Sequence, residues 1–152
     1  MVRKFIQSDK DAYIKMANEF YHTDAVDKPV PIEHFSDAFD EMMRSDQYAQ
    51  GYILELDGKT AGFCVTAKTY SVEAGGIVIW VEDFYVLPEF RSRGLGKEFL
   101  NYIEKNGDKK LRRLRLEIED ENVRAIELYE KMGFIRAPYN EMWKEIKPFS
   151  KP

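Results

Sequence analysis

The sequence predicts one α+β domain built around a single mixed sheet. Its 152 residues, 44% of them hydrophobic, suit one compact domain with a substantial core and leave no room for a second full domain. Strand and helix patterns follow each other in the order strand, two helices, three strands, helix, strand, helix and two strands. No repeat or linker interrupts them. We therefore expect residues 1–152 to form one domain with about seven strands and four helices.

The N-terminal part begins with a short strand in VRKFIQ, residues 2–7. Ser8 and Asp11 are three residues apart and resemble a capping box ahead of a helix. The apolar positions of this helix recur at helical spacing: Tyr13, Met16, Ala17 and Phe20. A polar, proline-bearing loop, residues 21–31, follows. A second helix begins near Pro31, and its expected buried face is formed by Ile32, Phe35, Phe39 and Met42.

The middle of the chain predicts a meander of three strands followed by a helix. Asp57 and Gly58 lie between two apolar runs, which is a strong hairpin signal. Residues 75–86, GGIVIWVEDFYV, form a nearly unbroken apolar run that is typical of a strand at the centre of a sheet. A helix follows, and its apolar face contains Leu95, Phe99, Tyr102 and Ile103. Gly107 is its expected end.

The C-terminal third predicts a strand, a helix and two closing strands. In LRRLRLEIE, leucine and isoleucine alternate with charged residues, which indicates a half-buried strand. Val123 to Met132 has helical spacing, and Gly133 stands just past the expected end. FIRAP, residues 134–138, and EMWKEI, residues 141–146, are predicted to be the last two strands.

Composition excludes several classes of partner. The net charge of −4 gives no support for a nucleic-acid or acidic-membrane partner, whereas a cationic substrate is compatible with it. The single cysteine, Cys64, cannot form a disulfide or a thiolate metal site within one chain, so we expect a small buried side chain and no metal. The sequence has neither a signal-peptide pattern nor an apolar run of ~20 residues. We therefore expect a soluble cytoplasmic protein.

The stretch EDFYVLPEFRSRGLGKEFL, residues 82–100, predicts an anion site. It joins a strand to a helix through a loop with two glycines. Unpaired amides of the first helical turn, the helix dipole and the close approach that glycine allows together favour a phosphate group. Arg91 and Arg93 can add charge-assisted hydrogen bonds to the same oxygens.

The two common nucleotide loops do not fit this stretch. A Rossmann fingerprint requires a third glycine where Phe99 stands, and it belongs near the start of a repeated βαβ pattern. A Walker loop requires a hydroxyl after Gly96 and Lys97, where this chain has Glu98. The phosphate ligand is therefore of another kind.

Arg91-Ser92-Arg93-Gly94-Leu95-Gly96 instead fits the pattern Arg/Gln-x-x-Gly-x-Gly/Ala and follows FYVLPEF. The segment ENVRAIELYEKMGF follows downstream, at residues 121–134. Together they resemble the two signatures of the GNAT superfamily of N-acetyltransferases, and the order of elements is similar over nearly the whole chain. The resemblance implies the GNAT fold, with a central sheet splayed between its fourth and fifth strands, and acetyl-CoA as the co-substrate.

The resemblance also implies roles for individual residues. Amides from Arg93 to Lys97 would bind the pyrophosphate, and backbone groups of Phe84 and Val86 would pair with the pantetheine arm as with an added strand. Tyr129 would lie near the sulfur and protonate the departing thiolate, since a phenol with a pKa of about 10 stays protonated at neutral pH. The implied cofactor-binding set is Phe84, Tyr85, Val86, Arg91, Ser92, Arg93, Gly94, Leu95, Gly96, Lys97, Asn122, Ala125 and Tyr129.

Glu82 and Asp83 are the candidate substrate residues. An alkylammonium with a pKa of about 10.4 must lose a proton before it can attack, and a carboxylate beside the thioester can bind the cation and take that proton. VEDFYV also resembles the strand that binds the amine in diamine and polyamine acetyltransferases. Adjacent strand residues face opposite ways unless a bulge intervenes. We favour Glu82 as the base or cation anchor; alternatively, either carboxylate forms an ion pair with Arg113 or Arg115.

The leading hypothesis is therefore an acetyl-CoA-dependent N-acetyltransferase that acts on a small cationic primary amine, such as a diamine or polyamine. Nothing in the sequence supplies a convincing acyl-enzyme nucleophile, so we expect direct attack in a ternary complex with Tyr129 and Glu82 as the catalytic pair. Two alternatives stay open: a protein N-terminus or lysine as the acceptor, and a non-catalytic acyl-CoA sensor. Related proteins often form dimers, so a homodimer is also expected.

Overall fold

The computed structural model describes residues 1–22 and 30–146. Most of the loop expected at 21–31 thus lies outside the described residues. Short 3-10 turns at Gln7–Asp9 and Pro88–Phe90 accompany the main elements. The helices and strands, in chain order, are β1 (Val2–Lys4), α1 (Lys10–Phe20), α2 (Ile32–Arg44), β2 (Ala49–Leu56), β3 (Lys59–Ser71), β4 (Gly76–Val86), α3 (Leu95–Asn106), β5 (Leu111–Leu116) and α4 (Val123–Lys131).

The chain divides into two compact units, Met1–Glu119 and Asp120–Pro152, and each is described by itself. The first contains one sheet with the strand order β1-β2-β3-β4-β5. Its first four strands pair antiparallel, whereas β4 and β5 pair parallel. A parallel pair needs a crossover connection, and α3 supplies it. The α+β class and the mixed sheet are as predicted.

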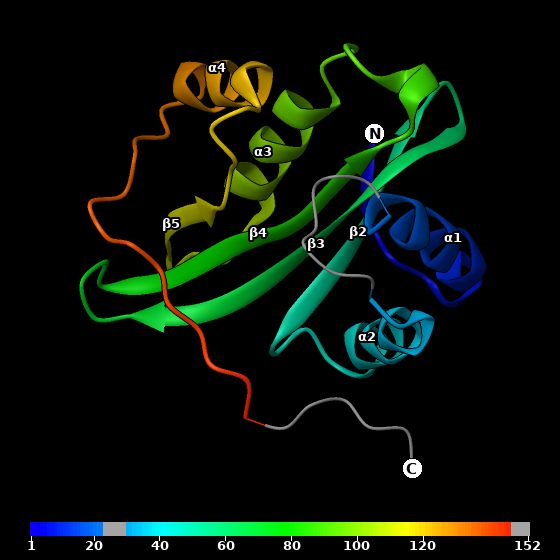
Figure 1. Cartoon of the computed structure of the whole chain (residues 1–152), viewed down its shortest axis with the longest axis horizontal. Coiled ribbons are helices and arrows are strands. Elements are labelled where there is room, and N and C mark those ends of the chain that lie inside the picture. The colour runs from blue at the N-terminus through cyan, green and yellow to red at the C-terminus, as the bar shows by residue number, and fades with distance from the viewer. Residues whose placement is uncertain (23–29, 147–152) are drawn as a thin grey trace. The chain divides into compact units, whose positions relative to one another are not determined.

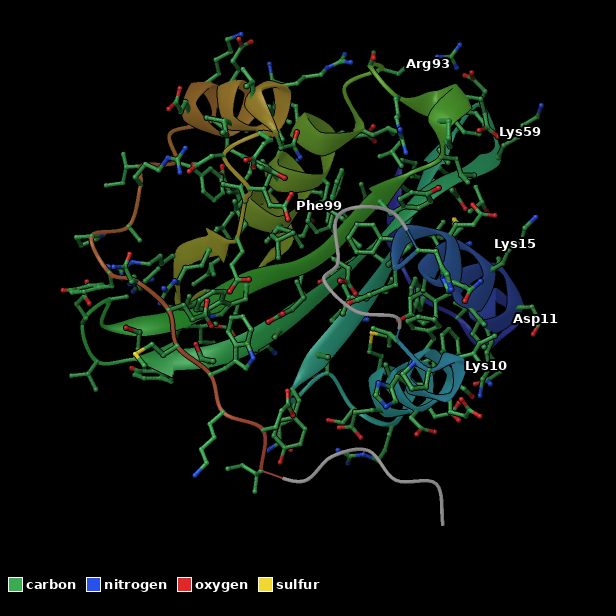
Figure 2. The ribbon with its side chains drawn as sticks, in the orientation of Figure 1. Lys10, Asp11, Lys15, Lys59, Arg93 and Phe99 are labelled. Carbon is green, nitrogen blue, oxygen red and sulfur yellow. The ribbon has the colours of Figure 1, made fainter. Side chains whose placement is uncertain are left out.

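Two helix layers cover the sheet of the first unit (Figure 1). On one face, α1 and α2 bury an aromatic core in which Tyr13 contacts Phe5, Phe39 and Phe63, with ring centroids 5.1, 5.9 and 5.2 Å apart. On the other face, Phe99 of α3 packs against Tyr52 and Phe84; Figure 2 labels it within that helix. Alternating strand residues thus supply both cores.

The hairpin between β2 and β3 is confirmed in its detail. Asp57 and Gly58 form the two-residue turn, and both have positive φ, 53° and 73°. Two consecutive left-handed residues make the type I′ turn that matches the twist of the flanking strands, and this is why Asp-Gly was the signal. The turn sets the register that carries β3 to the centre of the sheet.

Two details of the helix predictions are wrong. The N-terminal cap uses Asp9, whose carboxylate accepts the Ile6 N–H at 2.8 Å and pairs with Arg3 at 2.7 Å, so Ser8 and Asp11 form no box. This difference arises because Asp9 is held at the preceding 3-10 turn by Arg3, which lies only six residues before it. Ile32 stays 54% exposed, while Phe35, Phe39 and Met42 are buried as expected. As the first residue of α2, Ile32 lies before the turn that meets the sheet.

The expected count of seven strands is not confirmed, because the described residues form five. Within the described chain, neither 134–138 nor 141–146 is in a strand, and these ranges contain exposed apolar side chains: Ile135, Met142, Trp143 and Ile146. A strand depends on a neighbour for its hydrogen bonds, which an alternating pattern does not provide. Pro138 also lacks the N–H that a ladder needs.

We predict that Gly51→Ala destabilises the first unit. A Cβ on Gly51 would clash with the Phe5 ring, which packs against Tyr13 and Phe39. Overpacking of this kind costs about 1–3 kcal/mol, to be measured by urea unfolding. Adding Phe5→Leu should recover part of the loss, since the smaller side chain makes room. Purely additive losses in the double variant would contradict the steric explanation.

Candidate active site

The candidate site lies at the C-terminal end of β4. This strand pairs with β3 along its length, from Gly76 to Val86. Its pairing with β5 runs only from Ile77 to Val81 in the described chain. The last residues of β4 therefore continue past the β5 ladder, and in the described chain the Val86 carbonyl there accepts a hydrogen bond from the Arg91 side chain.

A β-bulge separates the two carboxylates of β4. Val81 pairs with Thr66 and Asp83 pairs with Val65, so Glu82 is the additional residue on its strand. Adjacent strand residues normally face opposite sides of a sheet, and a bulge is what allows Glu82 and Asp83 to face the same site. Past the bulge, normal alternation puts Asp83 on the same face as Tyr85, whose ring contacts Phe20 and Phe63. This is the face covered by α1.

Asp83 is the buried member of the pair. Its residue is 9% exposed, and the Tyr21 hydroxyl donates a hydrogen bond to Oδ1 at 2.6 Å. Burial raises the pKa of Asp83 to about 6, while the Tyr21 hydrogen bond lowers it and the nearby Glu82 raises it. Burial and the charge of Asp83 also raise the pKa of Tyr21, so that the phenol stays protonated.

Glu82 is exposed, in contrast to Asp83. Its charge raises the pKa of both Asp83 and Tyr21, which shows that the two carboxylates act on the same region. Alternation with Phe84 and Val86 favours Glu82, but the bulge interrupts that alternation at this residue. The buried carboxylate of the pair is thus Asp83, not the residue that alternation favours.

Two side chains at the C-terminal end of α1 join this region, and neither is among the site residues predicted from the sequence. Tyr21 follows the last residue of the helix, and Glu19 accepts a hydrogen bond from the Tyr85 hydroxyl at 3.3 Å. Neither belongs to a local motif, because their proximity to β4 arises from helix packing. In the sequence, the one indication of this contact is that Glu19 and Tyr21 flank the apolar Phe20 at the helix end.

The alternative ion pairs of the carboxylates are not those expected. Arg113 pairs with Glu73 at 3.0 Å, and the Arg115 guanidinium lies 4.0 Å from the centre of the Trp80 ring. Among the described residues, no lysine, arginine or histidine forms an ion pair with Asp83 or Glu19. Asp83 is therefore a buried acid without a basic neighbour in that part of the chain.

The glycine loop leads from β4 into α3. Ser92 and Gly94 have positive φ, 68° and 82°, and Gly94 caps the helix. The first intrahelical bond joins the Glu98 N–H to the Gly94 carbonyl at 2.9 Å. The preceding amides, those of Leu95, Gly96 and Lys97, therefore have no carbonyl partner within the helix. A Cβ on Gly94 would meet nothing within 4 Å, so there is open space beside these amides. This arrangement fits a pyrophosphate.

The two arginines of the loop point in different directions. The Arg91 Nε donates a hydrogen bond to the Val86 carbonyl at 3.0 Å, and its guanidinium lies 5.9 Å from the Tyr85 ring centre. Arg93 points outward and pairs with Asp57 at 3.6 Å, next to the β2–β3 turn that also carries Lys59 (Figure 2). Arg91 therefore lies against β4, and Arg93 remains at the surface.

The second unit contains the remaining predicted residues. Asn122 caps α4, with its side chain accepting the Ala125 N–H at 3.4 Å. Thus Asn122 and Ala125, both assigned to the cofactor arm by resemblance, also form a helix cap. Tyr129 is partly buried, and its ring packs against Phe134 with centroids 5.5 Å apart. Gly133, with φ 89°, follows the helix end.

Other candidate chemistry is limited. Cys64 is fully buried, and burial raises the pKa of its thiol, in agreement with its expected role as a core side chain. A search of the described residues for groups of three or more His, Cys, Asp or Glu that could hold a metal ion finds none. In that same part of the chain, no helix has the length and apolar character needed to cross a membrane.

Comparison with known proteins identifies the class. The acetyltransferase (GNAT) family profile matches residues 12–134. Thialysine N-epsilon-acetyltransferase of Bos taurus is 27% identical over 147 residues, covering 88% of this chain and 82% of that protein. Aminoglycoside N(6')-acetyltransferase type 1 of Salmonella typhimurium (strain LT2) is 27% identical over 105 residues, covering 66% and 71%.

Solved structures share the fold. A possible acetyltransferase from Clostridium difficile 630 has a TM-score of 0.82 at 19% identity, covering 97% of this chain and 98% of that one. AAC(6')-Iy in complex with a CoA-containing bisubstrate analog has a TM-score of 0.78 at 17% identity, covering 95% and 97%. The family profile, together with the named relatives, thus defines an acyltransferase that uses acetyl-CoA. The chain belongs to the acetyltransferase (GNAT) family and is an acetyl-CoA-dependent N-acetyltransferase.

We predict that Asp83→Asn stabilises the protein at pH 7. The raised pKa means that the buried carboxylate opposes folding when it is ionised, by about 3 kcal/mol for a shift from 3.8 to about 6. The gain should shrink as the pH falls below 6 and vanish below 3.8, where both states are protonated. Urea unfolding across this pH range measures it.

Asp108→Asn is the matched control. Asp108 is exposed and accepts the Lys110 N–H at 2.8 Å, a bond that asparagine can keep. The free energy of unfolding of this variant should follow that of the wild type at every pH. A pH-independent effect of Asp83→Asn would contradict the assignment of the raised pKa to Asp83.

Proposed function

We propose that the protein transfers the acetyl group of acetyl-CoA to the primary amine of a small cationic molecule, by direct attack in a ternary complex. The observation that carries this proposal is the acidic pair at the end of β4, Glu82 and Asp83, where the strand continues past β5. Relatives that are named for thialysine and for aminoglycosides, both amines, support this class of acceptor.

The cofactor half of the proposal uses the edge of β4 and the loop that follows. Pantetheine has amide groups, so it can pair with β4 at Phe84 and Val86 as an added strand would, taking the place of the Arg91 hydrogen bond to the Val86 carbonyl. The sheet would then be splayed between β4 and β5, as expected from the sequence. The pyrophosphate would lie against the first-turn amides of α3, with Arg91, Ser92 and Arg93 beside it. The short loop from Leu87 to Gly94 sets the distance between the two contacts.

The acceptor half depends on charge. A buried carboxylate without a basic neighbour among the described residues is costly, and a bound ammonium group would offset that cost. In this proposal Glu82 is the cation anchor at the exposed side of the bulge, and Asp83 and Glu19 extend the negative potential toward α1. An uncharged or anionic acceptor would gain nothing from this arrangement.

Direct attack is favoured over an acyl-enzyme. The Cys64 thiol is buried, and burial raises its pKa, so the reactive thiolate is disfavoured. In direct attack the amine nitrogen adds to the thioester carbon, the carbon–sulfur bond then breaks, and the thiolate takes a proton. Tyr129 remains the proposed donor of that proton, on the strength of its motif.

The proposal is tested by measuring thiol release from acetyl-CoA with diamines, polyamines, aminoglycosides, amino acids and short peptides. We expect small di- and polycationic amines to give the highest kcat/KM, because the acidic region favours multiple positive charges. Uncharged hydroxyl analogues of the same length are the matched control. CoA binding without thiol release from any amine would instead support a non-catalytic sensor.

A polypeptide acceptor is the second candidate. A putative ribosomal-protein bS18-alanine N-acetyltransferase of Bacillus subtilis (strain 168) is 32% identical over 103 residues, covering 64% of this chain and 61% of that protein. Short peptides that exceed every small amine in kcat/KM would establish this reading. The homodimer and the cytoplasmic location expected from the sequence stay predictions.

Tyr129→Phe is predicted to lower kcat by about 10²-fold or more while the affinity for acetyl-CoA changes little. The phenol would act only when the thiolate departs, and a general acid typically contributes 10²–10⁴-fold. Steady-state kinetics and CoA titration separate the two quantities. Tyr139→Phe, at a 70% exposed tyrosine of the same unit, should behave as the wild type. An unchanged kcat in Tyr129→Phe would remove this residue from the mechanism.

A further inference from the structure

We propose that Asp83 accepts the proton of the acceptor ammonium and that Tyr21 is a positioning residue that orients the Asp83 carboxylate for this step. The inference rests on the proposed function and divides the work of the acidic pair: Glu82 anchors the cation, and Asp83 receives the proton. It extends the site from β4 to the C-terminal end of α1, which no local motif indicated.

The geometry gives the two oxygens of Asp83 different roles. Oδ1 accepts the Tyr21 hydroxyl at 2.6 Å, while Oδ2 has no hydrogen-bond donor among the described residues. The Tyr21 phenol is itself held in place, because its ring contacts Phe20 and Phe35 with centroids 5.1 and 5.3 Å apart. One oxygen is thereby fixed and the other is left to receive a proton.

The surroundings of Asp83 favour proton uptake. Glu82 adds negative charge from β4, and Glu19 adds another carboxylate from α1 through its bond to Tyr85. The remaining titratable neighbours on α1 and β3 are neutral, because burial foremost, together with the Asp83 charge, raises the pKa of Tyr13, Tyr21 and Cys64. All these groups are neutral or negative.

The raised pKa of Asp83 makes proton transfer from an ammonium group less unfavourable. An alkylammonium with a pKa of about 10.4 lies between six and seven units above an ordinary aspartate. The pKa of Asp83, about 6, brings this gap to between about four and five units. The Tyr21 hydrogen bond acts in the other direction and lowers the pKa of Asp83, which keeps the carboxylate ionised at neutral pH before the substrate arrives.

The proton-transfer step balances in atoms and charge. One N–H bond of the ammonium breaks, an O–H bond forms on Asp83, and the released electron pair on nitrogen attacks the thioester carbon. Both groups become neutral, so no net charge is buried. Collapse of the adduct breaks the carbon–sulfur bond, the proposed donor Tyr129 protonates the CoA thiolate, and the second nitrogen proton replaces the one that Tyr129 gave. Asp83 then returns its proton to water.

The test is the pH profile of kcat/KM for thiol release with the best amine found. In Tyr21→Phe the loss of the hydrogen bond should move the acidic limb upward by about half a unit to one unit, with activity recovering above it. Tyr13→Phe is the control: Tyr13 is a 2% exposed tyrosine of the same helix and aromatic core, with no hydrogen bond to Asp83. Its limb should stay in place.

Asp83→Asn provides the second measurement, because asparagine can keep the Tyr21 bond and the variant is expected to be stable. Its rate should fall by about 10²-fold or more and then rise with pH toward the pKa of the free amine, because the amine must lose its proton in water. This variant decides the matter if Tyr21→Phe fails to fold.

Two results would overturn the inference: an acidic limb that Tyr21→Phe leaves in place, or an Asp83→Asn profile like that of the wild type. Either result in an enzyme that still releases thiol leaves the proposed function intact. Absence of thiol release with every amine in the wild type would instead reject the proposed function itself.

Discussion

The pairing of β4 is the constraint on which the rest of the structure depends. This strand is hydrogen-bonded to β3 over its full length but to β5 over only its first part. The paired part buries apolar side chains on both faces and holds the two helix layers together. The part beyond β5 carries the acidic pair and leads directly into the glycine loop and α3. One strand therefore fixes the distance between the acidic pair and the N-terminal end of α3.

The aromatic core under α1 stabilises the fold, whereas the buried carboxylate of Asp83 at the end of β4 destabilises it when ionised. Tyr13, Phe39 and Phe63 are almost fully buried and hold α1 against the sheet. Asp83 lies at the margin of that core, where ionisation costs stability. The Tyr21 hydroxyl, at the end of α1, offsets part of this cost because it donates a hydrogen bond to the Asp83 carboxylate. Stability is thus given up at the residue that we propose as the proton acceptor.

The sequence was sufficient wherever a local pattern determines the structure. Asp57-Gly58 specified the β2–β3 turn through its torsion angles, and the glycine loop specified the start of α3. It was insufficient where distant segments meet. The partner of Asp83 is Tyr21, 62 residues away. The closing strands failed for the same reason, since alternation identifies a face but not a neighbour.

The bulge at Glu82 also allows β4 to contain one more residue than the part of β3 that pairs with it. Val81 with Thr66 and Asp83 with Val65 are consecutive rungs of the ladder, so Glu82 is an insertion that the register absorbs. The strand can gain or lose this residue without turning any downstream side chain to the opposite face. Insertion or deletion of one residue at the bulge can thus add or remove a charge beside Asp83. The buried carboxylate and its tyrosine stay where the ladder puts them.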